Sequence, residues 1–402
     1  MPSKPRKAAI AFIMVTVILD VLSLGLIIPV LQKLIKELVG GDDSTASYYV
    51  GLFGTLWAFM QFFCSPIIGA LSDRFGRRPV LLTSAFGLGL DFILLAVAPN
   101  LAWLLIGRII TGMTAASFST AQAYLADVST PENRTAAFGL FGAAFGLGFV
   151  LGPIVGGMLG YIDLRLPFWV SAALTLLNAM YGYFVLPESL PPDKRSPFSW
   201  KRANPVGSLL LLWSQPGLLP MAITLFLYQL AHLAFQNVFV LYTDTYFQWS
   251  TLDVGLALGS VGILNFIVQG GLIRPATKRF GERPLVFLGL IGGSIGFLAY
   301  AFARDGKTFY LCTVIFALMG FFQASIQGLM SKKLGPTVQG RLSGATSSLN
   351  GIAGMTGPAM YAFVYTWSKG QSTAYQGAPF AVASAILGLA LVLAIIFVPK
   401  RT

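Results

Sequence analysis

Long apolar stretches separated by short polar loops dominate this sequence. A helix that crosses a bilayer needs about 20 mostly apolar residues. Twelve stretches meet this requirement: 8–31, 48–71, 79–98, 101–125, 134–160, 165–186, 216–242, 251–273, 284–303, 307–331, 341–366 and 374–398. The basic segment MPSKPRK precedes the first stretch without a small-residue cleavage site, so this stretch is expected to be an uncleaved span. The pattern predicts an all-α membrane protein with twelve transmembrane helices.

The longest polar break divides the chain into two groups of six spans. It covers residues 187–215 and contains the Pro-rich, basic run PESLPPDKRSPFSWKRANP. DRFGRRPVLL after the second span aligns with KRFGERPLVF after the eighth, and Gly152-Pro153 aligns with Gly357-Pro358, both at an offset of 205 residues. One shared offset indicates duplication, so we expect two pseudo-symmetric six-helix bundles that rock about a site near the bilayer midplane. The predicted parts are the bundle 1–186, a cytoplasmic linker 187–215 and the bundle 216–402.

Composition and charge support a membrane protein rather than a nucleic-acid-binding one. Hydrophobic residues make up 55% of the chain and charged residues only 10%, against about 25% charged in soluble domains. The net charge of +12 arises in short loops between apolar runs. Most of these basic residues lie on the side of both termini, which predicts that the termini are cytoplasmic.

The sequence contains no motif typical of an enzyme active site. Cys64 and Cys312 lie inside apolar runs, so no disulfide or metal site is expected. There is no phosphate-binding loop, no metal-ligand spacing and no Ser/His/Asp arrangement, and the 402 residues include one histidine. We therefore expect a protein without a cofactor that is not an enzyme and draws its energy from an ion gradient.

Two acidic residues lie deep within predicted spans. Asp20 is near the middle of span 8–31, and Asp91 interrupts the apolar run GLGLDFILLAVA, residues 87–98. An ionisable group at this depth costs several kcal/mol and by default marks an ion or proton pathway. Burial favours the protonated form of a carboxyl group, which would let it bind and release protons near neutral pH. Asp20 and Asp91 are therefore candidate proton-coupling residues.

Arg108 is the third candidate for proton coupling. It lies about as deep in span 101–125 as Asp91 lies in span 79–98, and these spans are antiparallel neighbours. At that depth Arg108 could tune the proton affinity of Asp91. The alternative is a static ion pair in which Arg108 holds Asp91 permanently ionised.

The loop after the second span and the end of the fourth carry a candidate inner gate. Its residues are Gly69, Asp73, Arg74, Gly76, Arg77, Arg78 and Asp127. Gly69 and Gly76 would allow close helix approach and a tight turn. Asp73 could accept hydrogen bonds from the N-terminus of another helix, where the helix dipole favours negative charge.

The arginines of this loop admit two interpretations. Arg77 and Arg78 could pair with Asp127 in a charge cluster that breaks when the halves rock. Alternatively, the loop arginines only set the orientation of the chain in the bilayer. Asp73 is not needed for orientation, which favours the gate.

Small and polar residues within the spans supply two further candidate sets. Small residues spaced four apart let helices pack closely, and proline kinks a helix. In span 134–160 the set is Gly148, Gly152, Pro153, Gly156 and Gly157.

An apolar cavity with few polar groups suits amphipathic organic molecules. Its candidate contacts are Gln61, His232, Gln236, Asn237, Asn265, Gln269, Gln323 and Gln327. Each of these could instead join helices by hydrogen bonds, and for His232 such a helix-interface role is the main alternative.

Several of these motifs resemble a known family. GALSDRFGRRPVLL (69–82), LLIGRIITGMTAA (104–116), GLGFVLGPIVGGMLG (146–160) and LDVLSLGLIIPVL (19–31) resemble motifs of the major facilitator superfamily and its twelve-span drug/proton antiporters. AYLADVSTPENR (123–134), VGILNFIVQGGLIRPATKRFGERP (261–284) and QGRLSGATSSLNG (339–351) resemble bacterial tetracycline-efflux proteins. The resemblance implies that Asp73 contacts span 11 and that the glycines of span 5 form a tight seam between the halves, which blocks leak. It also implies a role in transport for the carboxylates at Asp20 and Asp91.

The sequence departs from that family in its second half. Gly293 stands where the family has a carboxylate, Asn265 where it has a histidine, and Tyr49 where it has a second histidine. The lone His232 lies outside the family pattern and could be a relocated proton-coupling group.

We therefore expect an exporter of a drug, tetracycline-like or of several drugs, that exchanges its substrate for protons by alternating access. The expected partners are a small-molecule substrate, protons and the lipid bilayer, with no nucleic acid. We expect a monomer in a bacterial inner membrane. The alternative is a transporter, in either direction, of an endogenous metabolite such as a siderophore.

Overall fold

The computed structural model describes residues 7–114, 117–129, 134–198, 207–213, 217–333, 339–369 and 376–398. These residues form helices and connecting loops, with no strand among them. The first half contains α1 (Lys7–Leu38), α2 (Asp43–Phe75), α3 (Arg77–Val97), α4 (Leu101–Thr114), α5 (Ser117–Val128), α6 (Arg134–Ile162) and α7 (Leu166–Val185). The linker contributes two short 3-10 helices, η1 (Pro192–Lys194) and η2 (Gly207–Trp213).

The second half repeats this pattern. It contains α8 (Leu218–Phe247), α9 (Thr251–Phe266), η3 (Ile267–Leu272), α10 (Ile273–Phe280), α11 (Glu282–Phe302), α12 (Gly306–Ala317), α13 (Gly320–Lys332), α14 (Gln339–Lys369) and α15 (Ala378–Phe397). Across the described ranges, eleven helical segments are long and apolar enough to cross a membrane. α14 covers the remaining predicted span, 341–366, with a sequence richer in Gly, Ser and Thr. The predicted helical membrane fold is confirmed.

Three predicted spans are built from more than one helical segment. The span 101–125 comprises α4 and α5, on either side of residues 115–116, which lie outside the described residues. In the span 251–273, one stretch of π-helix, η3, follows α9. In the span 307–331, a turn at Leu318–Met319 separates α12 from α13. By length and composition, Leu101–Val128, Thr251–Phe280 and Gly306–Lys332 each qualify as a membrane span.

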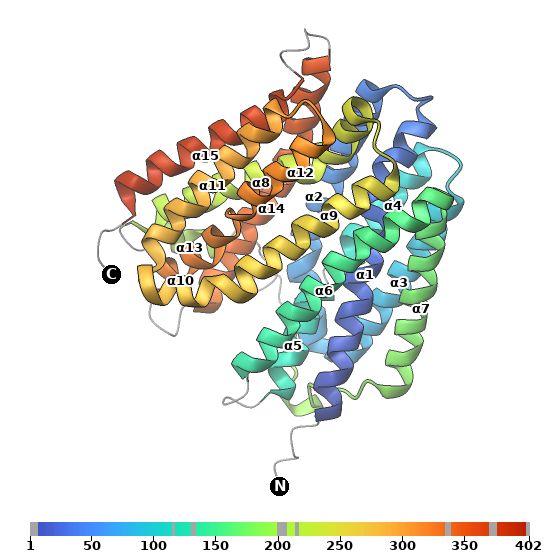
Figure 1. Ribbon diagram of the computed structural model, residues 1–402. Helices are drawn as coiled ribbons and strands as arrows, with labels where there is room; N and C mark the ends of the chain where they lie inside the picture. Colours follow the sequence, from blue (N-terminus) through green and yellow to red (C-terminus); the bar gives the residue numbers. More distant parts are fainter. Residues whose placement is uncertain are drawn as a thin grey trace. The chain divides into compact units, whose positions relative to one another are not determined.

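The chain divides into two compact units that exchange short helix ends. Unit 1 consists of residues 1–34, 59–204 and 250–259, and unit 2 of residues 35–58, 205–249 and 260–402. Within unit 1, α3 packs along α7, and within unit 2 the repeat-equivalent α11 packs along α15 (Figure 1). The same pairing in both units is the structural counterpart of the duplication that the sequence predicts.

The repeat also fixes two glycine-rich helix contacts. In unit 1, a Cβ added at Gly157 of α6 would lie 2.9 Å from Cα of Gly255 in α9. In unit 2, a Cβ added at Gly51 of α2 would lie 2.5 Å from the Cβ of Ala362 in α14. Both distances are too short for any larger side chain, so glycine at these positions allows the two helices to touch.

Candidate functional site

Asp91 is buried in unit 1 and hydrogen-bonded to Thr111. Its side chain is 1% exposed on α3, and the Thr111 hydroxyl on α4 donates to Oδ2 of Asp91. Oδ1 of Asp91 is buried without a hydrogen-bond partner among the described residues. Gly107, one turn before Thr111, makes room for the carboxylate, because a Cβ there would lie 2.9 Å from Oδ1. α4 therefore presents a cradle for one acidic side chain.

Arg108 reaches Asp91 through Thr111 rather than directly. Nη2 of Arg108 donates to the Thr111 hydroxyl at 3.4 Å. Among the described residues, no ion pair within 4.0 Å joins a nitrogen of Arg108 to a carboxylate oxygen of Asp91. The direct static pair considered from the sequence is therefore not formed. Arg108 is 8% exposed and Thr111 is fully buried, so the three side chains form one enclosed polar group.

The Thr111 hydroxyl has two acceptors for its single proton. Besides Asp91, the carbonyl oxygen of Gly107 lies 2.7 Å from Oγ1. An ionised carboxylate only accepts hydrogen bonds, whereas a protonated one can also donate. Thr111 can therefore donate to ionised Asp91 and, when Asp91 is protonated, accept from it and donate to Gly107 instead. The arrangement responds to the protonation state of one residue.

Asp20 has a different polar partner. Nδ2 of Asn178 on α7 donates to Oδ1 of Asp20 at 2.9 Å and to the carbonyl oxygen of Thr16 at 3.3 Å. Asn178 is 2% exposed, and its Oδ1 has no partner among the described residues. The sequence shows Asn178 only as one of several polar residues within spans. Its contact with Asp20 requires α1 and α7 to pack together, which no local pattern reveals.

The candidate inner gate forms a charge cluster around Arg77. Its Nη1 lies 2.6 Å from Oδ1 of Asp73, and its Nε donates to Oδ2 of Asp127 at 3.2 Å. The Ser189 hydroxyl donates to the same Asp127 oxygen at 3.1 Å. The predicted pairing between Arg77 and Asp127 is confirmed. The predicted contact between Asp73 and the eleventh span joins the two units and stays a prediction.

Two other expectations for this loop are wrong. Arg78 does not pair with Asp127; its Nη2 donates to the carbonyl oxygen of Tyr183 at 2.6 Å, and its guanidinium lies over the Tyr183 ring. Gly69 allows no close helix approach, because no atom of the described chain lies within 4 Å of a Cβ placed there. Arg74 is exposed at the end of α2, over the ring of Phe75. The gate cluster thus contains fewer residues of the motif than the sequence predicts.

Glu188 completes the cluster and was not predicted. Its Oε1 accepts from the backbone N–H of Arg77 at 2.9 Å, and Oε2 from that of Arg78 at 3.3 Å. These are the first N–H groups of α3, which have no partner within the helix. Gly76 has φ 106°, and a Cβ there would overlap the Glu188 carboxylate. The tight turn expected at Gly76 is confirmed, and it leaves space for this cap.

The glycine strip of α6 packs mainly on α1. A Cβ at Gly152 would lie 2.6 Å from Cα of Gly25, and one at Gly148 would lie 2.9 Å from Cβ of Val21. Gly156 similarly meets the backbone of Leu26. These three glycines therefore form a seam inside the first half, which corrects the expectation of a seam between the halves.

Two residues of the same set face another helix. The carbonyl of Pro153 and the Cα of Gly157 meet Gly255 of α9, which belongs to the second half of the sequence and packs in unit 1. The expected close packing between halves is thus found at Pro153 and Gly157 alone among the five.

The candidate substrate contacts lie mostly in unit 2. His232, Gln236 and Asn237 are on α8, Asn265 is on α9, Gln269 is in η3, and Gln323 and Gln327 are on α13. Gln61 is on α2, in the part that packs in unit 1.

Three contacts show what some of these side chains lie against. A Cβ added at Gly320 of α13 would lie 3.0 Å from Oδ1 of Asn265 and 3.5 Å from Cγ of Gln269. Short π-helices often occur at functional sites, and η3 carries Gln269 next to Asn265. Asn237 donates to the carbonyl of Leu233 on its own helix. Part of the polar set therefore gathers where α9, η3 and α13 meet.

His232 stacks between two aromatic rings. The ring centroid of Tyr228 lies 6.2 Å from that of the imidazole and the centroid of Phe316 lies 6.4 Å from it, with planes within 7°. Nδ1 is buried without a hydrogen-bond partner in the described chain. A hydrogen-bonded interface role for this nitrogen is therefore not found.

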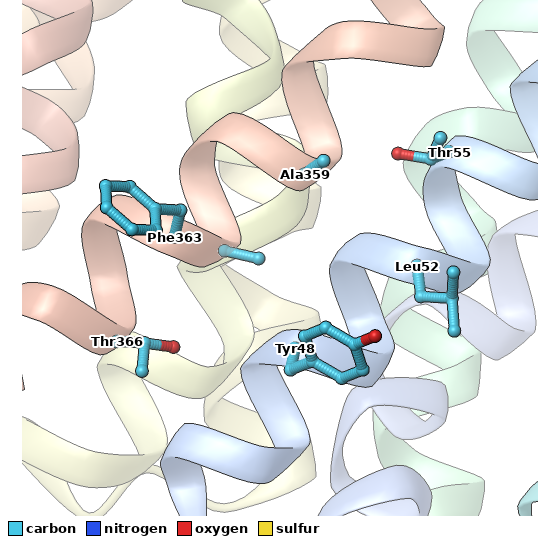
Figure 2. A pocket seen from close by; sticks show the side chains of 7 residues that line it. Tyr48, Leu52, Thr55, Ala359, Phe363 and Thr366 are labelled. Atoms are coloured by element: carbon cyan, nitrogen blue, oxygen red, sulfur yellow. The ribbon is translucent and has the colours of Figure 1, made fainter.

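A shallow cavity in unit 2 lies outside the predicted set. It encloses about 320 Å³ between α2 and α14, and Figure 2 shows side chains of both helices around it. Its lining is Tyr48, Leu52, Thr55, Ala359, Ala362, Phe363 and Thr366. Tyr48 is 62% and Phe363 72% exposed, so the cavity is open rather than enclosed.

Comparisons with known proteins identify the family of this chain. A family model for the Major Facilitator Superfamily matches residues 13–358. The chain is 36% identical to the tetracycline resistance protein, class C, of Escherichia coli, over 94% of each chain. It is 33% identical to the class D protein of Salmonella ordonez, over 97% of each.

A solved structure shows the same fold at lower identity. The human organic anion transporter MFSD10 (TETRAN) superimposes with a TM-score of 0.72 and 24% sequence identity, covering 98% of this chain and 100% of the other. This likeness concerns the fold alone. From the family match and the two relatives, the chain belongs to the Major Facilitator Superfamily, in the branch that contains the tetracycline resistance proteins, and is a multi-pass membrane transporter.

Proposed function

We propose that this transporter exports an amphipathic organic drug from the cytoplasm in exchange for protons, by alternating access. The observation that carries the proposal is the buried group of Asp91, Thr111 and Arg108. A passive membrane scaffold gains nothing from a carboxylate at this depth, because burying an ionisable group costs free energy. The two tetracycline resistance relatives favour a drug as the substrate.

The proton would bind at Asp91 and at Asp20. At Asp91, protonation would reverse the direction of the hydrogen bond with Thr111, so that Asp91 donates across α3 and α4 while the Thr111 hydroxyl donates to the Gly107 carbonyl on its own helix. Removing the carboxylate charge also weakens the attraction of Asp91 for Arg108. At Asp20, the Asn178 amide donates to the carboxylate and stabilises its ionised form. Each proton thus changes a contact between two helices of unit 1.

The substrate would bind where the polar groups of the second half gather. His232, Tyr228 and Phe316 supply a group of stacked rings, while Asn265 and Gln269 supply amides on α9 and η3. Stacked rings suit a planar apolar body, and a few amides fix its orientation. This division assigns proton handling to the first half and substrate contacts largely to the second.

Drug susceptibility tests the proposed substrate class. Cells that overproduce the chain should tolerate tetracyclines or other amphipathic drugs better than cells that carry the Asp91→Asn variant at equal membrane abundance. A deletion strain of the source organism that shows normal drug susceptibility but a growth defect under iron limitation would instead indicate the siderophore alternative.

A further inference from the structure

Four charged residues at helix ends form a continuous chain of ion pairs in unit 2. We propose that Lys369, Asp43, Lys36 and Asp244 are an outer latch, which holds the outer ends of helices from both sequence halves together and must open for substrate release. The inference rests on the proposed alternating-access function and adds the device that closes its outer side.

The chain of pairs joins four helices. Nζ of Lys36, at the end of α1, lies 2.7 Å from Oδ1 of Asp43 at the start of α2 and 2.8 Å from Oδ2 of Asp244 near the end of α8. Lys369, the last residue of α14, pairs with the other oxygen of Asp43. α1 and α2 belong to the first half of the sequence, whereas α8 and α14 belong to the second. Asp43 and Lys36 therefore link the halves twice.

The latch is balanced in charge and partly enclosed. It combines two lysines with two aspartates, and the side chains are between 11% and 24% exposed. Ion pairs on an open surface contribute little because water and salt screen them. Partial burial reduces this screening, so breaking the latch exposes four charges that each lose a close partner.

Below the ion pairs, hydrogen bonds and close packing also hold α2 and α14 together. The Ser47 hydroxyl on α2 donates to the carbonyl of Ala362 on α14 at 3.3 Å, and the Thr366 hydroxyl donates to the carbonyl of Ser44 at 3.4 Å. One turn deeper, Gly51 lies against Ala362. The outer end of α2 is thus joined to α14 by three successive layers of contact.

The position of the latch explains why it must open. Asp43 begins α2 and Asp73 lies near its other end, 30 residues later in the sequence. Asp73 belongs to the candidate inner gate. A carrier that rocks about a central site opens one side at a time. Contacts that join the two halves at the outer ends of their helices must therefore break in every cycle.

Thiol labelling from outside tests the latch without requiring transport. Ser47 is 3% exposed and lies one turn below Asp43, so Ser47→Cys is a near-isosteric reporter of the closed seam. It would be introduced after Cys64→Ala and Cys312→Ala, and labelled in intact cells with a membrane-impermeant maleimide, without drug. Labelling would be compared in the Lys36→Met and Asp43→Asn variants, with Lys369→Arg and Lys307→Met as controls. Lys307 is an exposed lysine on the same predicted side, outside the latch.

We expect Lys36→Met and Asp43→Asn each to raise the labelling rate about five- to tenfold, as loss of partly enclosed ion pairs shifts the population toward the open state. The two variants remove charges of opposite sign, so attraction of the reagent cannot explain an increase in both. Lys369→Arg and Lys307→Met should label at the parent rate. Size-exclusion profiles of the purified variants identify misfolding. A second control is a buried Ala172→Cys reporter in α7, outside the seam, at which a misfolded variant would show the same increase in labelling as at Ser47→Cys.

Unchanged labelling in both Lys36→Met and Asp43→Asn would overturn the latch. So would an equal increase at the Ala172→Cys reporter, because the variants would then loosen the whole fold. Failure of proton-coupled export leaves the labelling result unaffected, since the assay contains neither drug nor an imposed gradient. The latch and the proposed function can therefore fail separately.

Discussion

The Thr111 hydroxyl donates a hydrogen bond to the buried Asp91 carboxylate, and Arg108 donates to Thr111 from one turn earlier on the same helix. Thr111 therefore separates an acid from the base that the sequence suggests as its partner. A proton that binds to Asp91 would therefore act on the rest of the first half through its hydrogen bond with Thr111.

Thr111→Val should shift the pH dependence of transport. The change removes the donor to Asp91 while keeping a similar volume, so the ionised carboxylate loses a buried hydrogen bond worth roughly 1–3 kcal/mol. Since the ionised form is destabilised, Asp91 would keep its proton to higher pH, and the pH–rate profile should move upward by about one unit or more. Thr111→Ser retains the hydroxyl and should keep the parent profile. Drug transport by vesicles at graded pH measures this, and superimposable Val and Ser profiles would contradict the relay.

Asn178→Ala and Asp20→Asn should show non-additive effects. Asn178→Ala removes the hydrogen bond to the carboxylate and Asp20→Asn removes the charge that this bond stabilises, so the double variant should transport no more slowly than Asp20→Asn alone. Transport rates of the two single variants and the double variant at equal protein amount test this cycle. Strictly multiplicative losses would show that Asn178 acts independently of Asp20.

Glu188→Ala should destabilise the first turn of α3. Glu188 accepts hydrogen bonds from the N–H groups of Arg77 and Arg78, and loss of a helix N-cap costs about 0.5–2 kcal/mol. Glu188→Gln keeps one acceptor oxygen and should lose less. Thermal unfolding of the purified protein in detergent gives the order of stability, parent above Gln above Ala. Equal melting temperatures for all three would contradict the capping role.

Gly156→Ala should disrupt packing where Gly142→Ala does not. Both residues lie in α6, but a Cβ at Gly156 would overlap the Leu26 backbone, whereas one at Gly142 meets nothing within 4 Å. Overpacking of this kind costs roughly 1–3 kcal/mol. The fraction of monodisperse protein after mild heating should fall for Gly156→Ala only. Equal survival of both variants would mean that the α1–α6 seam yields easily.

The sequence predicts the helices well because bilayer burial imposes long apolar runs. Where the predicted spans fall on described residues, helices occupy all twelve, but several helices extend further. α1 continues to Leu38, and α2 begins at Asp43. These extra turns carry the polar residues Lys36 and Asp43, which an apolar pattern does not recognise. The outer latch therefore lies in segments that hydropathy alone assigns to loops.

The candidate site was predictable only where one residue is chemically unusual for its surroundings. A carboxylate in an apolar run identifies Asp91 and Asp20, and equal depth brings in Arg108. Thr111 and Glu188 carry no such signal, because threonine is common in spans and a glutamate after a helix is common in loops. Their roles arise from contacts between segments far apart in the sequence, such as the contact between Arg77 and Glu188, whose sequence separation is 111.

The most direct test of proton-coupled export uses vesicles whose cytoplasmic face points outward. With the interior made acidic, the parent protein should accumulate a tetracycline inside as protons leave, and accumulation should stop when the pH gradient is collapsed. Asp91→Asn, incorporated at the same amount, should accumulate none. Equal accumulation by the parent with and without the gradient, or full accumulation by Asp91→Asn, would contradict the account.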